Sequence, residues 1–368
     1  MSLAFIKKIP PPIIVAAQFA QVLFFVFLFL VSIDLLGTSF KMSGSGLAAR
    51  FMQATSNPFI GLIIGIVTTS IIQSSSSTTS IIVAMVGAGM LNLQNAIPMI
   101  MGANIGTTVT CTIVSFGYIG RKVEFERSFR ASIVHDLFNI CATIVLFPLE
   151  MLTGIIFKSA QFMVGVFQGV GGFDLVSPIK IILAPITHIV LKIVPNHYLL
   201  LILALIIMFY SMSRIVKNMK GIVMEKIENI LNKYLFRNIL ASMLFGCFFT
   251  ALVQSSSIAT SIVVPLVGAG LLSIEQIFPY TLGANVGTTI TAILAALSVG
   301  TGPAMSVAFA HLLFNIFGIL LIFPVRRIPI GLAKKIAAFV SVSKKNFFIF
   351  LIFFLMLHFV PIMFAIFF

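Results

Sequence analysis

The feature that most constrains the fold is a run of 70 residues, from Phe51 to Gly120, that contains no Asp, Glu, Lys, Arg or His. A second stretch, from Asn238 to Val325, has only Glu275 and His311 as ionisable side chains apart from Cys and Tyr. Because a transmembrane helix needs about 20 apolar residues, each stretch is too long to be a single span. The sequence therefore predicts an all-α polytopic membrane protein.

The composition excludes other classes of protein. Charged residues make up 9% of the chain and the mean hydropathy is +1.17, whereas about a quarter of the residues of a soluble protein are charged. A soluble enzyme is therefore excluded, and no nucleic-acid partner is expected. The expected surroundings are a lipid bilayer.

Most of the 23 Lys and Arg residues fall in four clusters: Lys7 and Lys8, 121–130, 214–237 and 326–345. Cytoplasmic loops carry an excess of positive charge, so the N-terminus and these three segments, interpreted as loops, are expected in the cytoplasm. The chain has no Asn-x-Ser/Thr sequon and little loop sequence. These features favour the cytoplasmic (inner) membrane of a bacterium over a eukaryotic cell surface.

The chain contains an internal duplication. Residues 73–110 align without a gap on residues 254–291, and 21 of the 38 positions are identical. A later pair, His135–Asn139 and His311–Asn315, matches at an offset of 176 instead of 181. This similarity is too high for shared apolar composition alone.

The charge clusters place equivalent helices of the two copies in opposite directions, which predicts the inverted-topology repeats that many secondary transporters have. The expected parts are an N-terminal anchor helix and outer loop (1–50), repeat 1 (51–157), a connecting segment and span (158–213), a basic cytoplasmic segment (214–238), repeat 2 (239–325), and a basic loop with a C-terminal helix (326–368). Within repeat 1 we expect a hairpin over 59–90, a broken helix over 96–118 and a helix over 131–157.

Ser74 to Ser77 form a polar insertion in an apolar run and cannot all lie on one packing face of a helix. Gly87 and Gly89 follow and can supply a tight turn. We infer a re-entrant hairpin, which is tolerated at membrane depth where it lines a cavity or is buried in protein. The segment 102–108 is expected to interrupt a helix, and 254–270 and 283–289 are expected to repeat both features.

Such segments can bind ions without formal charges. Helix ends expose N–H groups that favour an anion, while hydroxyl and amide oxygens suit a hard cation. The alternative is that Ser, Thr and Gly are small residues that let helices approach closely, and Gly102 and Gly106 have that spacing. We prefer the alternative for an isolated residue, and the ion-binding interpretation for the duplicated motifs.

The segments QSSSSTTS, QSSSIATS, GANIGTTVT, GANVGTTITAILAAL and VHDLFN closely resemble the type II sodium–phosphate cotransporters. The resemblance covers roughly 50–155 and 235–325. It implies import of inorganic phosphate on an inward sodium gradient by alternating access, with sodium ions co-transported and no organic cofactor. It leaves a homodimer open.

Carried over by position, the resemblance implies a set of site residues. The implied sodium ligands are Gln73, Ser76, Thr107, Thr108, Asp136, Gln254, Ser255, Thr288 and Thr291. The implied phosphate contacts are Ser74, Ser75, Ser76, Asn104, Ser255, Ser256, Ser257 and Asn285.

Asp136 matches the aspartate of electrogenic family members, in which about three sodium ions accompany a divalent phosphate. The family often has a serine where this chain has Ala103, which removes a hydroxyl from the expected third sodium site. Independently of the family, an acidic residue in a span indicates function by default. The alternative is that Asp136 is solvated near the end of its helix.

Two other functions were weighed. Hydroxyl and amide groups do not by themselves separate phosphate from another oxyanion, so that alternative stays open. A distant alternative is an intramembrane serine hydrolase with His135 as the base. It predicts one privileged serine, whereas the serines are duplicated and the chain has no GxSxG motif.

Overall fold

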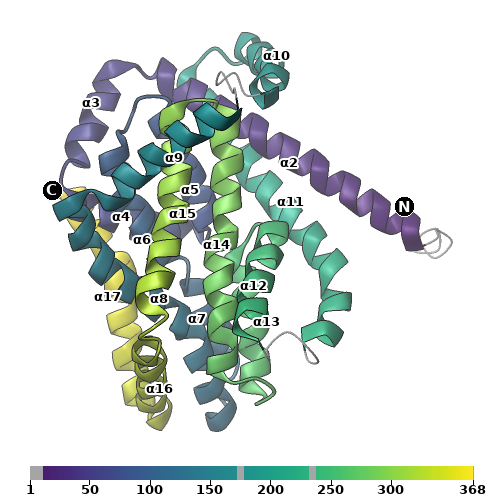
Figure 1. The fold of residues 1–368 in the computed structure, drawn as a ribbon, viewed down its shortest axis with the longest axis vertical. Coiled ribbons are helices and arrows are strands. Elements are labelled where there is room, and N and C mark those ends of the chain that lie inside the picture. Colours follow the sequence, from purple (N-terminus) through teal and green to yellow (C-terminus); the bar gives the residue numbers. More distant parts are fainter. Residues whose placement is uncertain (1–10, 172–177, 232–237, 368) are drawn as a thin grey trace.

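The computed structural model describes residues 11–171, 178–231 and 238–367, and all the regular secondary structure of these residues is helical (Figure 1). The first half contains α2 (Pro11–Met42), α3 (Gly44–Ala54), α4 (Pro58–Ile72), α5 (Ser75–Gly87), α6 (Leu93–Gly106), α7 (Val109–Phe116), α8 (Lys122–Thr153) and α9 (Ile155–Gly171). The second half contains α10 (Pro178–Ile193), α11 (His197–Leu231), α12 (Ile239–Val253), α13 (Ser256–Gly268), α14 (Ile274–Val299), α15 (Gly302–Ile322), α16 (Arg327–Val342) and α17 (Lys344–Phe367).

Within the residues that the structure describes, six helical segments are long and apolar enough to cross a membrane: α2, α6 with α7, α8, α11, α14 and α15. The number rises to seven if α3 and α4, which meet at a bend of 101°, are counted as one span. These lengths and compositions confirm the prediction of an all-α, multi-pass membrane protein.

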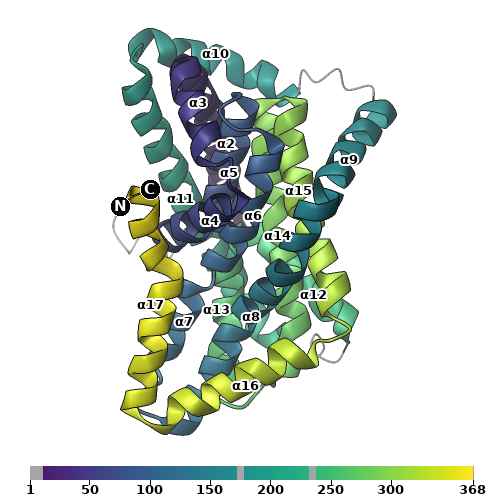
Figure 2. The same cartoon turned by 90° about the vertical axis from the view of Figure 1, so that its left-hand side faces the viewer.

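Several apolar helices are too short to cross by themselves, among them α4, α5, α12 and α13. Helices α4 and α12 have 15 residues each, and α5 and α13 have 13. At 1.5 Å per residue they are about 20–23 Å long, less than the hydrocarbon core of about 30 Å. In Figures 1 and 2, α4 lies near the middle of the molecule, α5 lies above it, and α12 and α13 lie in the lower half.

Glycines allow α4 to pack closely against α6, and α12 against α14. A Cβ atom at Gly65 of α4 would overlap a backbone carbonyl of α6, and one at Gly102 of α6 would overlap a carbonyl of α4. Gly246 of α12 and Gly283 of α14 stand in the same relation. Close packing by small residues, which was the alternative interpretation of Gly102 and Gly106, is therefore a role of these glycines in the fold.

The expected interruption at 283–289 is wrong, because α14 is continuous from Ile274 to Val299. Gly287 packs against α12 with a helical backbone. The hydroxyls of Thr288 and Thr289 donate to carbonyls three residues earlier in the same helix. In the first half, by contrast, a break separates α6, which ends at Gly106, from α7.

The basic segments are helical, which corrects their prediction as loops. Arg121 precedes α8, and this helix extends from Lys122 to Thr153 instead of 131–157; an ion pair between Arg130 and Glu126 supports its first turns. Residues 214–231 continue α11, and 232–237 lie outside the described residues, as does the N-terminal cluster. Most of 326–345 forms α16, which crosses the lower end of the bundle (Figure 2).

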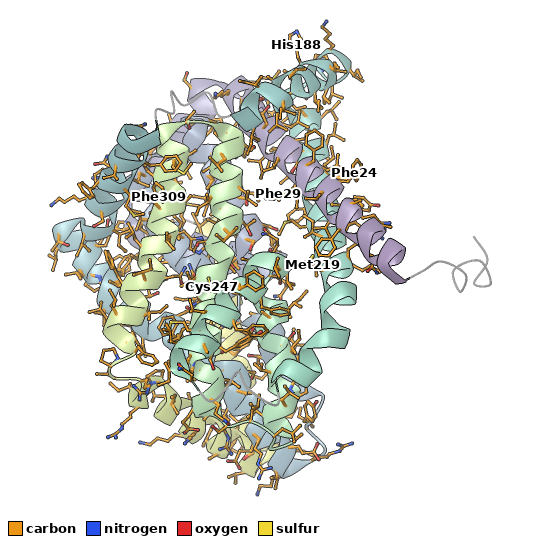
Figure 3. The ribbon with its side chains drawn as sticks, turned by 45° about the vertical axis from the view of Figure 1, so that its right-hand side comes forward. Phe24, Phe29, His188, Met219, Cys247 and Phe309 are labelled. Carbon is orange, nitrogen blue, oxygen red and sulfur yellow. The ribbon has the colours of Figure 1, made fainter. Side chains whose placement is uncertain are left out.

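Apolar side chains lie both on the outer surface of the helix bundle and in its core. On α2, Phe24 is 55% exposed and points away from the bundle, whereas Phe29 is buried (Figure 3). Many polar side chains are instead buried, including Ser75, Ser76 and Ser77 of α5. This inverted polarity is expected of a protein whose outer surface meets lipid and whose interior contains the functional groups.

Candidate functional site

Two glutamines have an unusual backbone conformation. Gln73 has φ of 58° and Gln254 has φ of 59°, and these are the only non-glycine residues with positive φ in the described part of the chain. The N–H of each glutamine still donates to the carbonyl four residues earlier. Its left-handed backbone then ends the helix. A left-handed residue other than Gly costs about 1–3 kcal/mol, and such strain clusters at functional sites.

The two glutamine side chains are held in the same way. The Gln73 amide donates to the Ser70 carbonyl, and its side-chain oxygen accepts a 2.7 Å hydrogen bond from the Thr110 hydroxyl. The Gln254 amide donates to a carbonyl of α12, and its oxygen accepts a 2.6 Å bond from the Thr291 hydroxyl. Thr110 was missed as a site residue, although the repeat aligns it with Thr291.

The serine that follows each glutamine caps the next helix. Ser74 Oγ accepts a hydrogen bond from the N–H of Ser77, and Ser255 Oγ accepts one from Ile258. These caps place the N-termini of α5 and α13 at the two turns. Helix N-termini present backbone N–H groups and a partial positive charge, which together favour an anion.

The two turns contact each other. The Ser76 hydroxyl donates to the Gln254 carbonyl at 3.4 Å, and the Ser257 hydroxyl donates to the Thr107 carbonyl at 3.2 Å. Because α5 lies above and α13 below, their N-termini approach each other in the middle of the molecule (Figures 1 and 2). We call the residues 73–77, 254–257 and the threonines that bond to them the turn cluster.

The structure brings most of the predicted site residues into this cluster. Further buried members are Ser75, Ser256 and Thr107, whereas Thr108 and Thr288 are buried but lie outside the cluster as defined. Their threonine hydroxyls donate to carbonyls of their own helices, Thr107 to Ala103 at 3.0 Å and Thr108 to Ile105 at 3.2 Å. Each of these hydroxyl oxygens keeps lone pairs with which to accept a bond or bind a cation.

The two asparagines are placed differently. His135 donates through Nε2 to the side-chain oxygen of Asn285, whose amide donates to Asn139 at 2.7 Å. The Asn139 amide in turn donates to the backbone carbonyl of Asn104 at 2.8 Å. His135 is therefore engaged by Asn285, and this geometry gives no support to the alternative of His135 as the base of a serine hydrolase.

Asp136 lies in the interior. Its side chain is 7% exposed, about four turns into α8, so the alternative of a solvated helix end is wrong. Its carboxylate lies near Thr108 and His358. His358 of α17 is fully buried and was missed; its only signal in the sequence is an ionisable residue in an apolar run.

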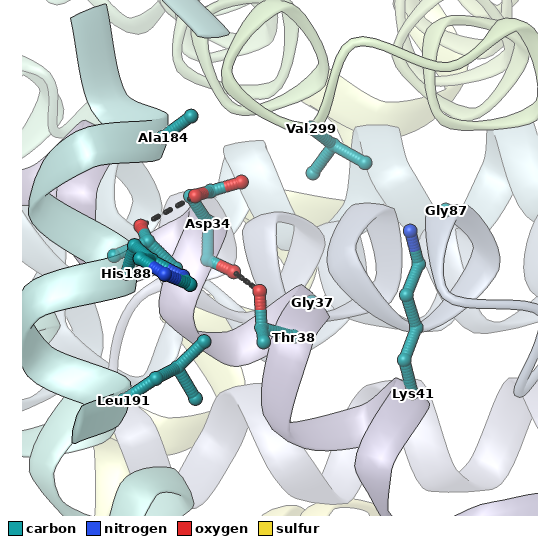
Figure 4. A pocket seen from close by; sticks show the side chains of 10 residues that line it. Asp34, Gly37, Thr38, Lys41, Gly87, Ala184, His188, Leu191 and Val299 are labelled. Carbon is teal, nitrogen blue, oxygen red and sulfur yellow. Dashed lines mark hydrogen bonds between the residues drawn. The ribbon is translucent and has the colours of Figure 1, made fainter. Parts of the chain in front are cut away.

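Two cavities lie away from the turn cluster. One of about 220 Å³ is lined by Asp34 and Lys41 of α2 and His188 of α10 (Figure 4). In it, Asp34 accepts a 2.6 Å bond from the Thr187 hydroxyl. A second cavity, of about 430 Å³, contains Glu150, whose carboxylate accepts bonds from the first N–H groups of α9. None of the predicted site residues lines either cavity.

A bundle of spanning helices around duplicated polar turns has the architecture of a secondary transporter. The family model described as Na+/Pi-cotransporter matches residues 28–170 and 207–359. The chain belongs to this family, which is one of transporters and not of enzymes, and the family predicted from the motifs is thereby confirmed.

Curated relatives are similar over most of the chain. Sodium-dependent phosphate transport protein 2A of Rattus norvegicus is 33% identical over 393 residues, which cover 85% of this chain and 62% of the relative. Sodium-dependent phosphate transport protein 2B of Homo sapiens is 31% identical over 410 residues, which cover 84% of this chain and 59% of the relative. The chain thus spans about 60% of the length of these relatives. No solved structure matches it.

Proposed function

We propose that this protein imports inorganic phosphate, coupled to an inward sodium gradient. The observation that carries the proposal is the turn cluster, in which two equivalent left-handed glutamines hold their side-chain oxygens against Thr110 and Thr291. Oxygen atoms of amides and hydroxyls are the ligands that a hard cation prefers. The printed names of the relatives support sodium and phosphate as the transported ions.

The sodium ions are assigned to two equivalent groups of oxygen atoms. One group is Gln254, Ser255, Thr288 and Thr291, and the other is Gln73, Ser76 and Thr107, with Thr110 added because it bonds to Gln73. The repeat makes three positions of the two groups equivalent (Gln73 and Gln254, Thr107 and Thr288, Thr110 and Thr291), whereas Ser76 corresponds to Ser257 and not to Ser255. These three equivalent pairs support at least two sodium ions per cycle.

Phosphate is assigned to the space between the two helix N-termini. The serines of both first turns, Ser74 to Ser76 and Ser255 to Ser257, would donate from hydroxyl and backbone groups. Asn104 and Asn285 would lie beside them. Neither turn contains Lys or Arg, so bound sodium must offset the charge of the anion, which is a physical reason for coupling.

Asp136 is assigned to a third sodium ion, together with Thr108, which makes transport of divalent phosphate electrogenic. A tenfold gradient contributes about 1.4 kcal/mol per ion, and one net charge crossing 100 mV contributes about 2.3 kcal/mol. Three ions would supply about 6.5 kcal/mol, against about 2.8 kcal/mol for two ions that move without net charge. Only the former sustains accumulation above about 10⁴-fold.

The topology proposed for this cycle is that of two inverted repeats. The short pairs α4–α5 and α12–α13 would be re-entrant hairpins that enter from opposite faces and meet near the bilayer midplane. The basic N-terminus and segments 121–130, 214–237 and 326–345 would face the cytoplasm of a cell with an inner membrane. Alternating access would then move the hairpins relative to the surrounding spans.

The test is uptake of labelled phosphate into proteoliposomes that contain the purified protein. An inward sodium gradient should drive uptake and an equal potassium gradient should not. Adding unlabelled arsenate or sulfate at the same concentration as phosphate tests the selectivity for phosphate. Competition by sulfate would favour a transporter of several oxyanions. Absence of sodium-driven uptake by folded protein would contradict the proposal.

A further inference from the structure

The duplication includes a set of polar residues outside the turn cluster. His135 and Asn139 of α8 correspond to His311 and Asn315 of α15, and all four are buried. Asn285 of α14 corresponds to Asn104 of α6 in the same way. In the first set, His135 and Asn139 contact Asn285 of the other repeat. In the second set, α15, which carries His311 and Asn315, packs against α6, which carries Asn104. The duplication therefore supplies the residues for two copies of one network.

One copy is formed. The chain of bonds runs from His135 to Asn285, from Asn285 to Asn139, and from Asn139 to the carbonyl of Asn104. These bonds link α8 to α14 of the other repeat, and then link α8, through Asn139, to α6. The chain of bonds therefore connects the two repeats in the interior. Each of its members is at most 2% exposed, and its bonds are therefore not in competition with bulk water.

The other copy is open. The Asn104 amide donates to Ile100 of its own helix at 2.9 Å, and the Asn315 amide donates to the His311 carbonyl at 3.0 Å. Within the described residues, neither ring nitrogen of His311 nor the side-chain oxygen of Asn315 has a hydrogen-bond partner. Buried polar groups are normally bonded, and a native exception requires an explanation.

The explanation that the geometry favours is a second arrangement in which the open copy closes. By analogy with the formed copy, His311 would donate to the Asn104 side chain and the Asn104 amide would donate to Asn315. The side-chain amide of Asn104 would have to give up its hydrogen bond to the Ile100 carbonyl. The backbone carbonyl of Asn104 is already the last acceptor of the formed copy. By the same analogy, the second copy would end at the Asn285 carbonyl. The two copies would therefore share Asn104 and Asn285, so that a change in one bears on the other.

We propose that the two copies form alternately, and that His135, Asn139, His311 and Asn315 are positioning residues of the transport cycle. This inference rests on the proposed transport function. In a molecule built from two similar repeats, exchanging the conformations of the repeats generates a second state that uses equivalent contacts. Two such states have similar free energies, because each forms one network and opens the other.

The test uses matched variants at equivalent positions. Asn139→Leu removes the formed copy and should shift the population toward the other state. Asn315→Leu removes only the copy that is open here and should shift it toward the present state. A purely structural defect would shift the population of the two states in the same direction in both variants, since the two residues are equivalent and similarly buried.

The readout can be independent of transport. In a background with Cys141→Ala and Cys247→Ala, Cys111 is the single thiol; it is 1% exposed and contacts Thr260 of α13 from α7. Its labelling rate reports separation of these two helices. We expect the rate to move at least about threefold in opposite directions in the two variants, with the double variant near the parent protein.

If the labelling rate of Cys111 moved in the same direction in both variants, or in neither, the proposal would be overturned. If one of the leucine variants does not fold, His135→Gln and His311→Gln form a second matched pair with the same expectation. Sodium-driven uptake by the parent protein is measured separately. If the parent protein takes up phosphate but the labelling rates of the two variants do not move in opposite directions, only the alternating networks are rejected. If the parent protein takes up no phosphate, the proposed function is rejected.

Discussion

The hydroxyl of Thr291 lies 2.6 Å from the side-chain oxygen of Gln254, and the hydroxyl of Thr110 lies 2.7 Å from that of Gln73. In each pair a spanning helix contacts a left-handed turn contributed by its own repeat. The hydroxyl holds the amide oxygen at the turn, where both oxygens can contact a cation. The same hydrogen bond therefore occurs at equivalent positions of the two repeats.

Removing one hydroxyl should weaken sodium binding at its own turn. We expect Thr291→Val, which preserves the shape of the side chain, to raise the half-saturating sodium concentration by about tenfold, since one hydrogen bond and one oxygen ligand are lost. Sodium titration of phosphate uptake measures this, and Thr110→Val should behave alike. Thr38→Val, which removes a comparable bond on α2, is the control, and an equal effect there would contradict the assignment.

Capping and anion binding can be separated at Ser255. Asp is as good an N-cap as Ser, so Ser255→Asp should keep the thermal stability of the protein within about 0.5 kcal/mol. It also places a carboxylate at the proposed anion site, and we expect phosphate affinity to fall at least about tenfold. Ser255→Ala should instead lose about 1 kcal/mol of stability. Undiminished phosphate affinity in Ser255→Asp would place the anion elsewhere.

The voltage dependence of transport should depend on Asp136. In proteoliposomes with a sodium gradient, an inside-negative potential should stimulate uptake by the parent protein. Asp136→Asn should remove this stimulation, because the term of about 2.3 kcal/mol per charge and 100 mV disappears when the third ion is lost. Uptake measured at 0 and −100 mV tests this. A variant that keeps its voltage dependence would show that the charge is carried by other groups.

Close packing of α12 and α14 should make Gly283 intolerant of a side chain. A Cβ atom there would overlap a backbone carbonyl of α12, and we expect Gly283→Ala to cost about 1–3 kcal/mol of stability. Gly37 of α2 is the matched control, because nothing lies within 4 Å of the position of its Cβ atom. Thermal unfolding of both variants is the measurement. Equal melting temperatures would show that the helices can separate without loss.

Much of the fold could be predicted from the sequence, because membrane insertion and duplication leave long patterns. The uncharged run 51–120 was enough for a polytopic helical protein, and the repeated Gln-Ser-Ser-Ser motif marked the two turns. The left-handed backbone of Gln73 could not be predicted, since Gln rarely adopts it. The extent of α14 was also missed, because glycine alone does not distinguish a helix break from close packing.

The side-chain partners were harder to predict than the site itself. The contact of His135 with Asn285 joins segments about 150 residues apart, so it depends on how the helices pack and not on any local pattern. The repeat could have identified Thr110 but gives no reason for one His–Asn network to be formed and its equivalent open.

The central claim is that sodium offsets the charge of the anion at a cluster without Lys or Arg. Its most direct test is equilibrium binding of labelled phosphate to the purified protein, without any gradient, in sodium and in potassium at equal ionic strength. We predict that phosphate binds at least about tenfold more tightly in sodium, a coupling of about 1.4 kcal/mol, and that phosphate tightens sodium binding by the same factor. Equal phosphate affinity in the two salts would contradict the account.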